Sequence, residues 1–315
     1  MAIPNGITKT WDVAVAGEIF VDHIFSGFDR WPRPGEEHFT DHYLREAGGG
    51  AAITACALGR LGREVALFAV MGEQDEWLRQ RLAEFKVGLE SLRRGPVATA
   101  VSVSISTRDD RSFLTWPGAN RDLAKYLHEA DTQLQLTQAR HVHLAMPIER
   151  DLALELFPKL RAAGCTISLD TGHRTEWLQD ESNWRTCGEV DFFLPNQHEA
   201  EIVTGKRGPE QLLTGLQAKG IANVVLKLGR FGAHALLDGK CYSAAALPVD
   251  AVDTTGAGDA FDAGLIDALL DHAQPPEMLE RACLCGSLST RRAGALNALP
   301  NREELSHFHE QLKQH

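Results

Sequence analysis

The stretch Asp253–Phe261 reads DTTGAGDAF, and the rest of the chain is interpreted outward from it. Gly256 and Gly258 bracket one small residue, which allows the backbone to approach a ligand closely. The apolar run over residues 260–270 predicts a helix that begins at these glycines. Because the first N–H groups of a helix are unpaired and its dipole favours negative charge, the stretch predicts an anion-binding site.

Asp259 lies at the position where that anion would bind. A carboxylate repels a phosphate group, so its presence there would be unfavourable unless it had a function. We therefore interpret Asp259 as a functional residue. We predict that Asp259 accepts the proton of a hydroxyl group that attacks a bound phosphoryl group. The alternative is a glycine turn that caps a helix, with Asp259 interacting favourably with the helix dipole.

The composition is that of a soluble globular protein of 315 residues, 43% hydrophobic and 24% charged. The net charge of -11, with no basic block, argues against nucleic acid or an anionic membrane as a partner. No apolar run approaches the roughly 20 residues needed to span a bilayer. Residues 1–10 lack the apolar segment of a signal peptide, so we expect a cytoplasmic protein.

Short apolar segments alternate with amphipathic ones, which predicts an α/β protein whose mostly parallel sheet has helices on both faces. The predicted strands are residues 12–17, 65–70, 141–145, 166–170, 191–195 and 223–228, followed by a hairpin of residues 233–237 and 241–246. One predicted helix is opened by residues 48–52 and ends near residues 61–62. The other predicted helices are residues 151–163, 260–270, 277–292 and 301–313.

Two segments interrupt this rhythm. Residues 24–45 are irregular and polar, and residues 97–106 alternate small or polar side chains with Thr99, Val101, Val103 and Ile105. A period of two is typical of a half-buried strand. Strand character resumes at residues 112–116, so the two interruptions predict a second, smaller sheet.

The stretch Asp253–Phe261 resembles the C-terminal signature of the ribokinase-like (PfkB) carbohydrate kinases, and the resemblance extends from Val13 to the last helix. It implies a three-layer α/β/α sandwich with a mostly parallel central sheet. It also implies one kinase domain over residues 1–315, with a small β lid formed by about 20–46 and 97–120. Such a lid closes over the substrate and excludes water.

The resemblance assigns roles to the signature stretch. Asp259 is the catalytic base, and the backbone N–H groups of Gly256, Ala257 and Gly258 form the anion hole. The implied reaction is transfer of a phosphoryl group from ATP, with Mg²⁺, to a hydroxyl of a small sugar or sugar-like substrate. We expect a small-molecule substrate and a homodimer formed through the lid, because an exposed sheet edge or face favours a partner.

The expected substrate-binding residues follow strands or open helices. Asp22 closes the pattern GEIFVD after the first strand and is expected to bind substrate hydroxyls; the alternative is a carboxylate in a surface turn. The remaining residues of this group are Gly48, Gly49, Asn120 and Arg174. Arg174 would reach a phosphate or a sugar carboxylate, or else is a surface arginine. Ile53 stands where the family usually has an asparagine that contacts the sugar, so either the substrate has fewer hydroxyls there or Thr54 compensates.

Nucleotide and metal contacts are expected farther along the chain. Asn196 and Glu199 match an N-x-x-E pattern, in which Glu199 would bind Mg²⁺; the same pair is also a helix capping box. The expected nucleotide-binding residues are Asn196, Lys227, Gly229, Gly232 and Asn297. Asp253 and Thr255 match positions that bind a monovalent cation, usually K⁺, in many members of the family.

Several residues are interpreted as structural. The six cysteines are scattered without a CxxC pair, so we expect them to be reduced and mostly buried. His141 and His143 share one face of a strand, and we expect packing or hydrogen bonding there rather than a metal.

Three other functions are compared with a sugar kinase. A nucleoside kinase of the same fold stays open because of Ile53. A sensor that binds ligand without turnover has no use for a base beside the phosphate. A dinucleotide oxidoreductase is disfavoured, because no G-x-G-x-x-G follows the first strand.

Overall fold

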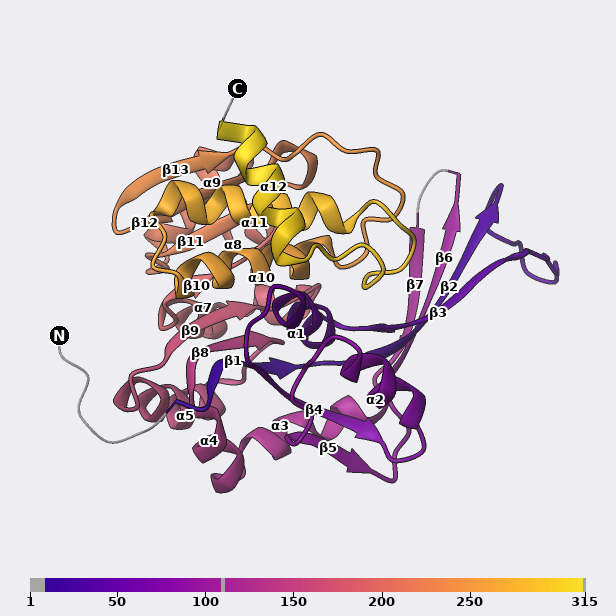
Figure 1. Ribbon diagram of the computed structural model, residues 1–315, viewed down its shortest axis with the longest axis horizontal. Helices are drawn as coiled ribbons and strands as arrows, with labels where there is room; N and C mark the ends of the chain where they lie inside the picture. Colours follow the sequence, from indigo (N-terminus) through magenta and orange to yellow (C-terminus); the bar gives the residue numbers. More distant parts are fainter. Residues whose placement is uncertain (1–8, 109–110, 314–315) are drawn as a thin grey trace.

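The computed structural model describes residues 9–108 and 111–313. Its main sheet has nine strands in the order β13-β12-β11-β10-β9-β8-β1-β4-β5, parallel except that β12 runs antiparallel to both of its neighbours (Figure 1). The strands are β1 Trp11–Gly17, β4 Val65–Gly72, β5 Leu92–Gly95, β8 Ala139–Ala145, β9 Thr166–Asp170, β10 Phe192–Phe193, β11 Val224–Lys227, β12 Ala233–Leu237 and β13 Lys240–Ala244.

Helices cover both faces of this sheet. Val13 and Val15 of β1 pack with α1, α2 and α10, whereas Ala14 and Ala16 of the same strand pack with α3, α4 and α5 on the other face. The helices are α1 Gly50–Arg60, α2 Glu76–Ala83, α3 Leu123–Leu127, α4 Ala130–Leu136, α5 Arg150–Ala162, α6 Thr175–Gln179, α7 Glu181–Gly188, α8 Gln197–Thr204, α9 Pro209–Ala218, α10 Ala257–Leu270, α11 Pro275–Ser289 and α12 Arg302–Lys313. The predicted three-layer sandwich is confirmed.

The order of the strands places the site. From β1 the chain moves to β4 and β5 on one side, and then crosses to β8 and builds the sheet outward to β13 on the other side. The direction in which successive strands are added to the sheet therefore reverses between β1 and β8, although these two strands are parallel. In sheets of this kind, ligands bind outside the carboxyl ends of the strands at the point of reversal.

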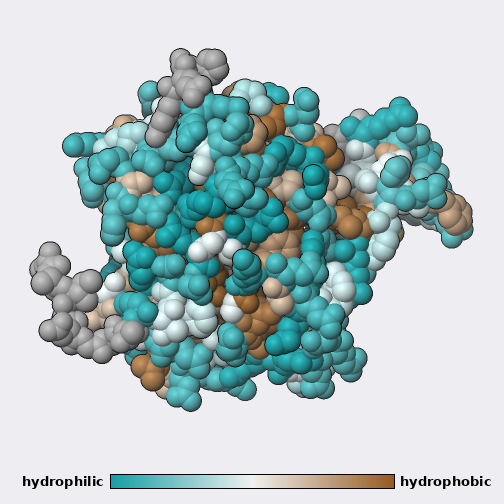
Figure 2. Space-filling view, viewed as in Figure 1, coloured by the Kyte–Doolittle hydropathy of each residue, from teal (hydrophilic) through white to brown (hydrophobic). Residues whose placement is uncertain are grey.

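A second sheet of four strands projects from one side of the body (Figure 1). Its order is β3-β2-β6-β7, and we call it the lid; its strands are β2 Phe20–Phe28, β3 His42–Gly48, β6 Val101–Thr107 and β7 Arg111–Trp116. The central pair β2 and β6 is parallel and the outer pairs are antiparallel. Figure 2 shows the lid standing clear of the body, with apolar residues near their junction.

Several predicted elements are shorter than the sequence indicates. The strand predicted at residues 191–195 is reduced to β10, Phe192–Phe193, because Pro195 has no N–H and Asn196 already caps α8. The helix predicted at residues 277–292 is α11, which ends at Ser289. Within the described residues, no helix is long and apolar enough to cross a membrane.

Candidate active site

Asp259 lies in the first turn of α10, where the turn before the helix brings it to the reversal point of the main sheet. Gly256 is the N-cap with a φ of 74°, a conformation that glycine adopts at little cost. Within the described residues, the N–H groups of Gly256 and Gly258 donate to no backbone carbonyl. The hydroxyl of Thr54 in α1 donates a hydrogen bond to the backbone carbonyl of Asp259 at 3.2 Å, which ties the first turn of α10 to α1.

Asp22 approaches the same point from lid strand β2. A Cβ atom on Gly48 would lie 2.0 Å from Oδ2 of Asp22, and one on Gly50 would lie 3.0 Å from Oδ1 of Asp259. The glycine run between β3 and α1, in which Gly49 is the N-cap of α1, therefore leaves room for both carboxyl groups. The structure thus places Asp22 against Gly48 and Asp259 against Gly50, and the charge of Asp259 acts on Asp22.

Both carboxyl groups hold their protons more tightly than free aspartic acid does. Burial, followed by the negative charge of Asp170, raises the pKa of Asp259 to about 7. Burial and the negative charges of Glu46 and Asp259 raise the pKa of Asp22 to about 7 as well. A carboxyl group with a pKa near neutral pH is suited to exchange protons with a substrate.

The side chain of Asn120 holds the backbone between β1 and β2. Its buried side chain donates to the carbonyl of Ile19 at 3.0 Å and accepts from the N–H of the same residue at 3.4 Å. Its amide is thus engaged with the backbone between β1 and β2, and it fixes the segment that leads to Asp22.

Lys227 lies at the end of β11 in a buried cluster of charges. Its Nζ donates to Asp170 at 2.6 Å and to both oxygens of Asp262 at 3.1 Å. Despite burial, the ammonium keeps the pKa of Asp170 below its usual range, whereas burial raises the pKa of Asp262 well above it. Carboxylate oxygens of Asp170, Asp259 and Asp262 lie within 4.8 Å of one another, so Lys227 supplies the positive charge that these acids require.

Asn196 and Glu199 form the predicted capping box of α8. The side chain of Asn196 accepts from the N–H of Glu199 at 2.9 Å, and the Glu199 carboxylate accepts from the N–H of Asn196 at 2.9 Å. Glu199 is buried, and burial together with the charge of Asp170 raises its pKa to about 8.

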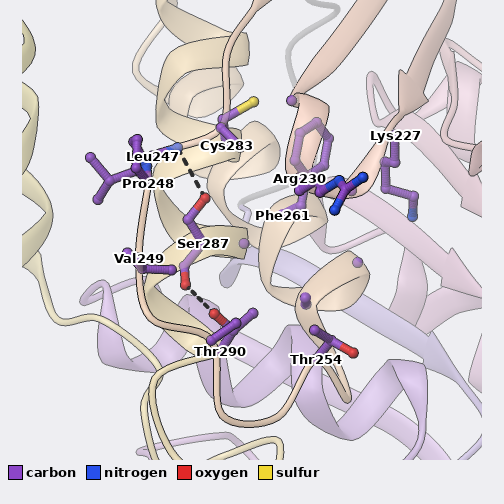
Figure 3. A pocket seen from close by; sticks show the side chains of 17 residues that line it. Lys227, Arg230, Leu247, Pro248, Val249, Thr254, Phe261, Cys283, Ser287 and Thr290 are labelled. Atoms are coloured by element: carbon purple, nitrogen blue, oxygen red, sulfur yellow. Dashed lines mark hydrogen bonds between the residues drawn. The ribbon is translucent and has the colours of Figure 1, made fainter. Parts of the chain in front are cut away.

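A cavity of about 440 Å³ lies beside α10. Leu247, Pro248 and Val249 line one side and Lys227 and Arg230 the other, as Figure 3 shows. The lining also includes Gly229, Gly232, Thr254, Ala257, Gly258, Phe261, Cys283, Ser287 and Thr290, among others. The cavity therefore reaches the start of α10, where the anion hole is predicted.

Four predicted site residues have other contacts. Asn297 is not among the residues that line the cavity; its side chain accepts from Arg81 at 2.9 Å and donates to the carbonyl of Ala293 at 2.8 Å. Arg174 pairs with Glu18 after β1. Asp253 and Thr255 both bond to Arg111 of the lid.

The histidine pair belongs to the interior of the sheet. His141 and His143 both contact the hydroxyl of Ser168, at 2.7 and 2.8 Å, and His141 also contacts Thr166. Burial lowers the pKa of His141 to about 3 and of His143 to about 4, so both are neutral. The predicted hydrogen-bonding role is confirmed. Five of the six cysteines are buried, and Cys241 is exposed.

The sequence reasoning missed Asp170, Asp262 and Arg111. Asp262 follows Asp259 by three residues, so the two lie on one face of a helix. This spacing was the available signal, but residues 260–270 were interpreted as an apolar helix. Asp170 ends a correctly predicted strand at the ligand-bearing edge. Arg111 carries no local signal, because its partners lie more than 140 residues away.

Comparison with known proteins gives one consistent result. The model of the pfkB family carbohydrate kinases matches residues 12–302. The ribokinase of Haemophilus influenzae is 26% identical over 307 residues, which cover 94% of this chain and 97% of the relative. The fructokinase of Klebsiella pneumoniae is 28% identical over 282 residues, 83% of this chain and 91% of the relative.

Solved structures show the same fold. The ribokinase of Arabidopsis thaliana, complexed with ribose and ATP, superposes with a TM-score of 0.82 at 24% identity, covering 94% of this chain and 98% of that chain. At this identity the likeness establishes the fold alone.

Proposed function

Because this chain belongs to the pfkB family of carbohydrate kinases, we propose that it transfers the terminal phosphoryl group of ATP to a hydroxyl of a small sugar or sugar-like substrate. The observation that carries the proposal is the meeting of Asp22 and Asp259 over the glycine run, next to the cavity that reaches the start of α10. An acceptor hydroxyl between these carboxylates would face a phosphoryl group held by the backbone N–H groups of Gly256, Ala257 and Gly258.

The proposed reaction moves one proton and one phosphoryl group. Asp22 orients the acceptor through a hydrogen bond from a substrate hydroxyl, and Asp259 accepts the proton of the hydroxyl that attacks. The new bond forms between that oxygen and the terminal phosphorus, while the bond from phosphorus to the bridging oxygen of ATP breaks and ADP leaves with the electron pair. The anion-hole N–H groups stabilise the charge on the transferred group.

The nucleotide would occupy the cavity described above. Its apolar side, formed by Leu247, Pro248 and Val249, suits the flat face of a base, and Gly229 and Gly232 leave room beside it. Lys227 lies at the opposite side, next to Gly258, with its Nζ 3.5 Å from the position of a Cβ atom there. Its positive charge would therefore act on the phosphates while it stays bonded to Asp170.

We propose that the capping-box pair Asn196 and Glu199, which lies near the charges of Asp170 and Lys227, holds a magnesium ion. Glu199 is a buried carboxyl whose pKa is raised to about 8, so a nearby cation would stabilise its ionised form. Glu199, acting through water together with Asn196, would hold the ion. When bound, Mg²⁺ neutralises negative charge on the phosphates.

The region around Ile53, beside the turn at Gly256, is apolar. Ile53 is buried and packs against Ala295 and the turn at Gly256, within 2.9 Å of where a Cβ atom of Gly256 would lie. It supports the anion-hole turn and does not offer the amide that the family usually places there. We therefore propose a substrate that makes its polar contacts on the side of Asp22.

The test is ADP release from Mg-ATP across a panel of ketoses, aldoses, sugar acids and nucleosides. We expect turnover on a member of the panel and a loss of about 10²- to 10⁴-fold in kcat for Asp259→Asn, because the proton acceptor is removed. Asp238→Asn is the matched control, since Asp238 is exposed in the turn between β12 and β13.

Each other outcome has a definite meaning. Wild-type turnover by Asp259→Asn would remove the base assignment. Turnover on nucleosides alone would identify a nucleoside kinase. ATP binding without turnover on any member would favour the sensor function over the kinase function.

A further inference from the structure

The lid contacts the turn before α10 through one side chain. Arg111 begins β7, and its guanidinium donates to Oδ1 of Asp253 at 2.7 Å, to the hydroxyl of Thr255, and to the hydroxyl of Thr254 at 3.2 Å. The ring of Phe113 lies beside the guanidinium, with 5.3 Å from its centroid to the central carbon. The three bonded residues directly precede the glycines of the anion hole.

The carboxylate of Asp253 accepts four hydrogen bonds, three of them at Oδ1. Besides Arg111, its Oδ1 accepts from the N–H of Thr255 at 2.9 Å and from the hydroxyl of Thr255 at 2.6 Å. Its Oδ2 accepts from the N–H of Gly294 at 2.9 Å. Both lone pairs of Oδ1 are therefore engaged by its three donors, whereas Oδ2 has a single donor.

The sequence predicts a monovalent cation at Asp253 and Thr255, and this arrangement does not fit one. Oδ1, the carboxylate oxygen bonded to Thr255, already accepts three hydrogen bonds, one of them from the guanidinium. The hydroxyl of Thr255 both donates to Asp253 and accepts from Arg111. A second cation here would also face the charge of the guanidinium. The positive charge at this turn is the guanidinium of Arg111, in the place where a bound metal ion was predicted.

Arg111 is on the face of the lid that covers the site. In the register of the sheet, Arg111 lies opposite Ser106 and Asp22 lies opposite Ser102. Side chains alternate along a strand, so positions 102 and 106 share one face, and Arg111 is therefore on the same face as Asp22. One face of the lid thus provides both the substrate carboxylate and the arginine of the turn.

We infer that Arg111 is a built-in cation that positions the anion-hole turn and links its geometry to the position of the lid. The inference rests on the proposed function, because the anion hole is part of it. While the lid covers the pocket, the guanidinium fixes Asp253, Thr254 and Thr255. Loss of this contact releases the turn, so phosphoryl transfer depends on a covered site and does not require K⁺.

The first test compares Arg111→Met with Arg111→Lys and the wild type in equal concentrations of NaCl, KCl or guanidinium chloride. Wild-type kcat should change less than about twofold between salts. Arg111→Met should lose about tenfold or more in kcat, with a smaller change in the KM of the sugar, because the anion hole acts on the transition state. Guanidinium or K⁺ should restore part of that loss, and Arg111→Lys should lose less than Arg111→Met.

The matched control is Arg108→Met. Arg108 is also a lid arginine, 77% exposed, and it pairs with Asp29 at 2.6 Å away from the turn. Its kcat should equal that of the wild type in every salt. An Arg111→Met enzyme with wild-type kcat overturns the inference, and so does a loss in kcat that neither cation reduces.

The second test needs no substrate. Melting temperatures are measured in KCl and in NaCl, where an ion that binds only the folded state raises the melting temperature. The wild type should melt equally in both salts, while Arg111→Met should melt higher in KCl because K⁺ replaces the guanidinium charge lost beside Asp253. A wild type stabilised specifically by K⁺ overturns the inference, even if the kinase panel is silent, so the two proposals fail separately.

Discussion

At the scale of single residues, we expect the carboxyl groups of Asp22 and Asp259 to determine how activity depends on pH. Asp22 and Asp259 both have pKa values of about 7, and each acts as an acceptor of hydrogen only when ionised. We expect kcat/KM to fall by about 100-fold per pH unit well below neutral pH, because two groups must lose protons together. A pH profile of kcat/KM measures this slope.

A variant of Asp22 shows how much of this slope comes from each of the two carboxyl groups. In Asp22→Asn the slope should fall to about tenfold per pH unit, because only Asp259 still titrates. A flat acid limb in the wild-type profile would show that neither raised pKa governs the reaction.

The same pKa values predict a stability effect with a definite sign. Asp259 binds its proton more tightly in the folded chain than in the unfolded chain, so its ionisation lowers stability as pH rises from about 4 to 7. Asp259→Asn should therefore raise the melting temperature more at pH 8 than at pH 5. An equal shift at both pH values would contradict this.

Site residues were predictable where their signal is local. The glycines and Asp259 are close in sequence, and Asp22 follows a strand that could be recognised from its apolar run. The cluster around Lys227 was not predictable, because Asp170 lies 57 residues before it and Asp262 35 residues after it. Only the packing of β9, β11 and α10 brings these charges together.

At the scale of elements, α10 joins the catalytic end of the molecule to its C-terminal helices. Asp267, fully buried near the far end of α10, accepts from Arg63 at 2.7 Å, from Arg281 of α11 at 2.7 Å and from Arg302 of α12 at 2.7 Å. One carboxylate thus ties α10 to α11, to α12 and to the segment after α1.

We expect Asp267→Asn to lower the free energy of unfolding by about 3–5 kcal/mol, because it leaves buried guanidinium groups without their shared negative charge. Urea unfolding at neutral pH measures the change. Asp271→Asn is the control: this carboxylate binds Arg63 and Arg281 as well, but its side chain is 42% exposed, so the loss should be about 1 kcal/mol or less. Equal losses in the two variants would show that burial does not set the strength of these ion pairs.

The longer elements were predictable and the short ones were not. The strand at residues 166–170 has the bounds of β9, and the helix predicted at 151–163 is shifted by one residue from α5. Helices α3 and α6 have five residues each, too few to show a repeating apolar face. Strand β10 was predicted too long because its length depends on pairing with β9 and β11 rather than on its own composition.

At the scale of the whole molecule, the outer face of the lid suits a second copy of the chain. The face opposite Asp22 contains Phe25, Tyr43, Val103, Leu114 and Trp116, as the strand register shows. Tyr43, Leu114 and Trp116 are 52%, 59% and 45% exposed. We propose that this face pairs with its equivalent in a homodimer, because a contiguous apolar sheet face of this kind typically marks an interface.

Sedimentation velocity tests the dimer. The wild type should sediment with twice the chain mass of 34.6 kDa at micromolar protein, and Leu114→Asp should sediment as a monomer. Leu134→Asp is the matched control, since Leu134 is 61% exposed on α4 in the body, and it should leave the mass unchanged. A monomeric wild type would contradict the proposal.

The parallel pairing of β2 with β6 also sets an order of events during folding. It joins Val21 to Val101 across a segment that contains α1, β4, α2 and β5. Closing a loop of that length costs entropy before contacts are gained, so we expect the docking of β4 beside β1 to shorten it first. All four lid strands also precede α10 in the chain. During synthesis, every strand of the lid therefore leaves the ribosome before the turn that Arg111 contacts.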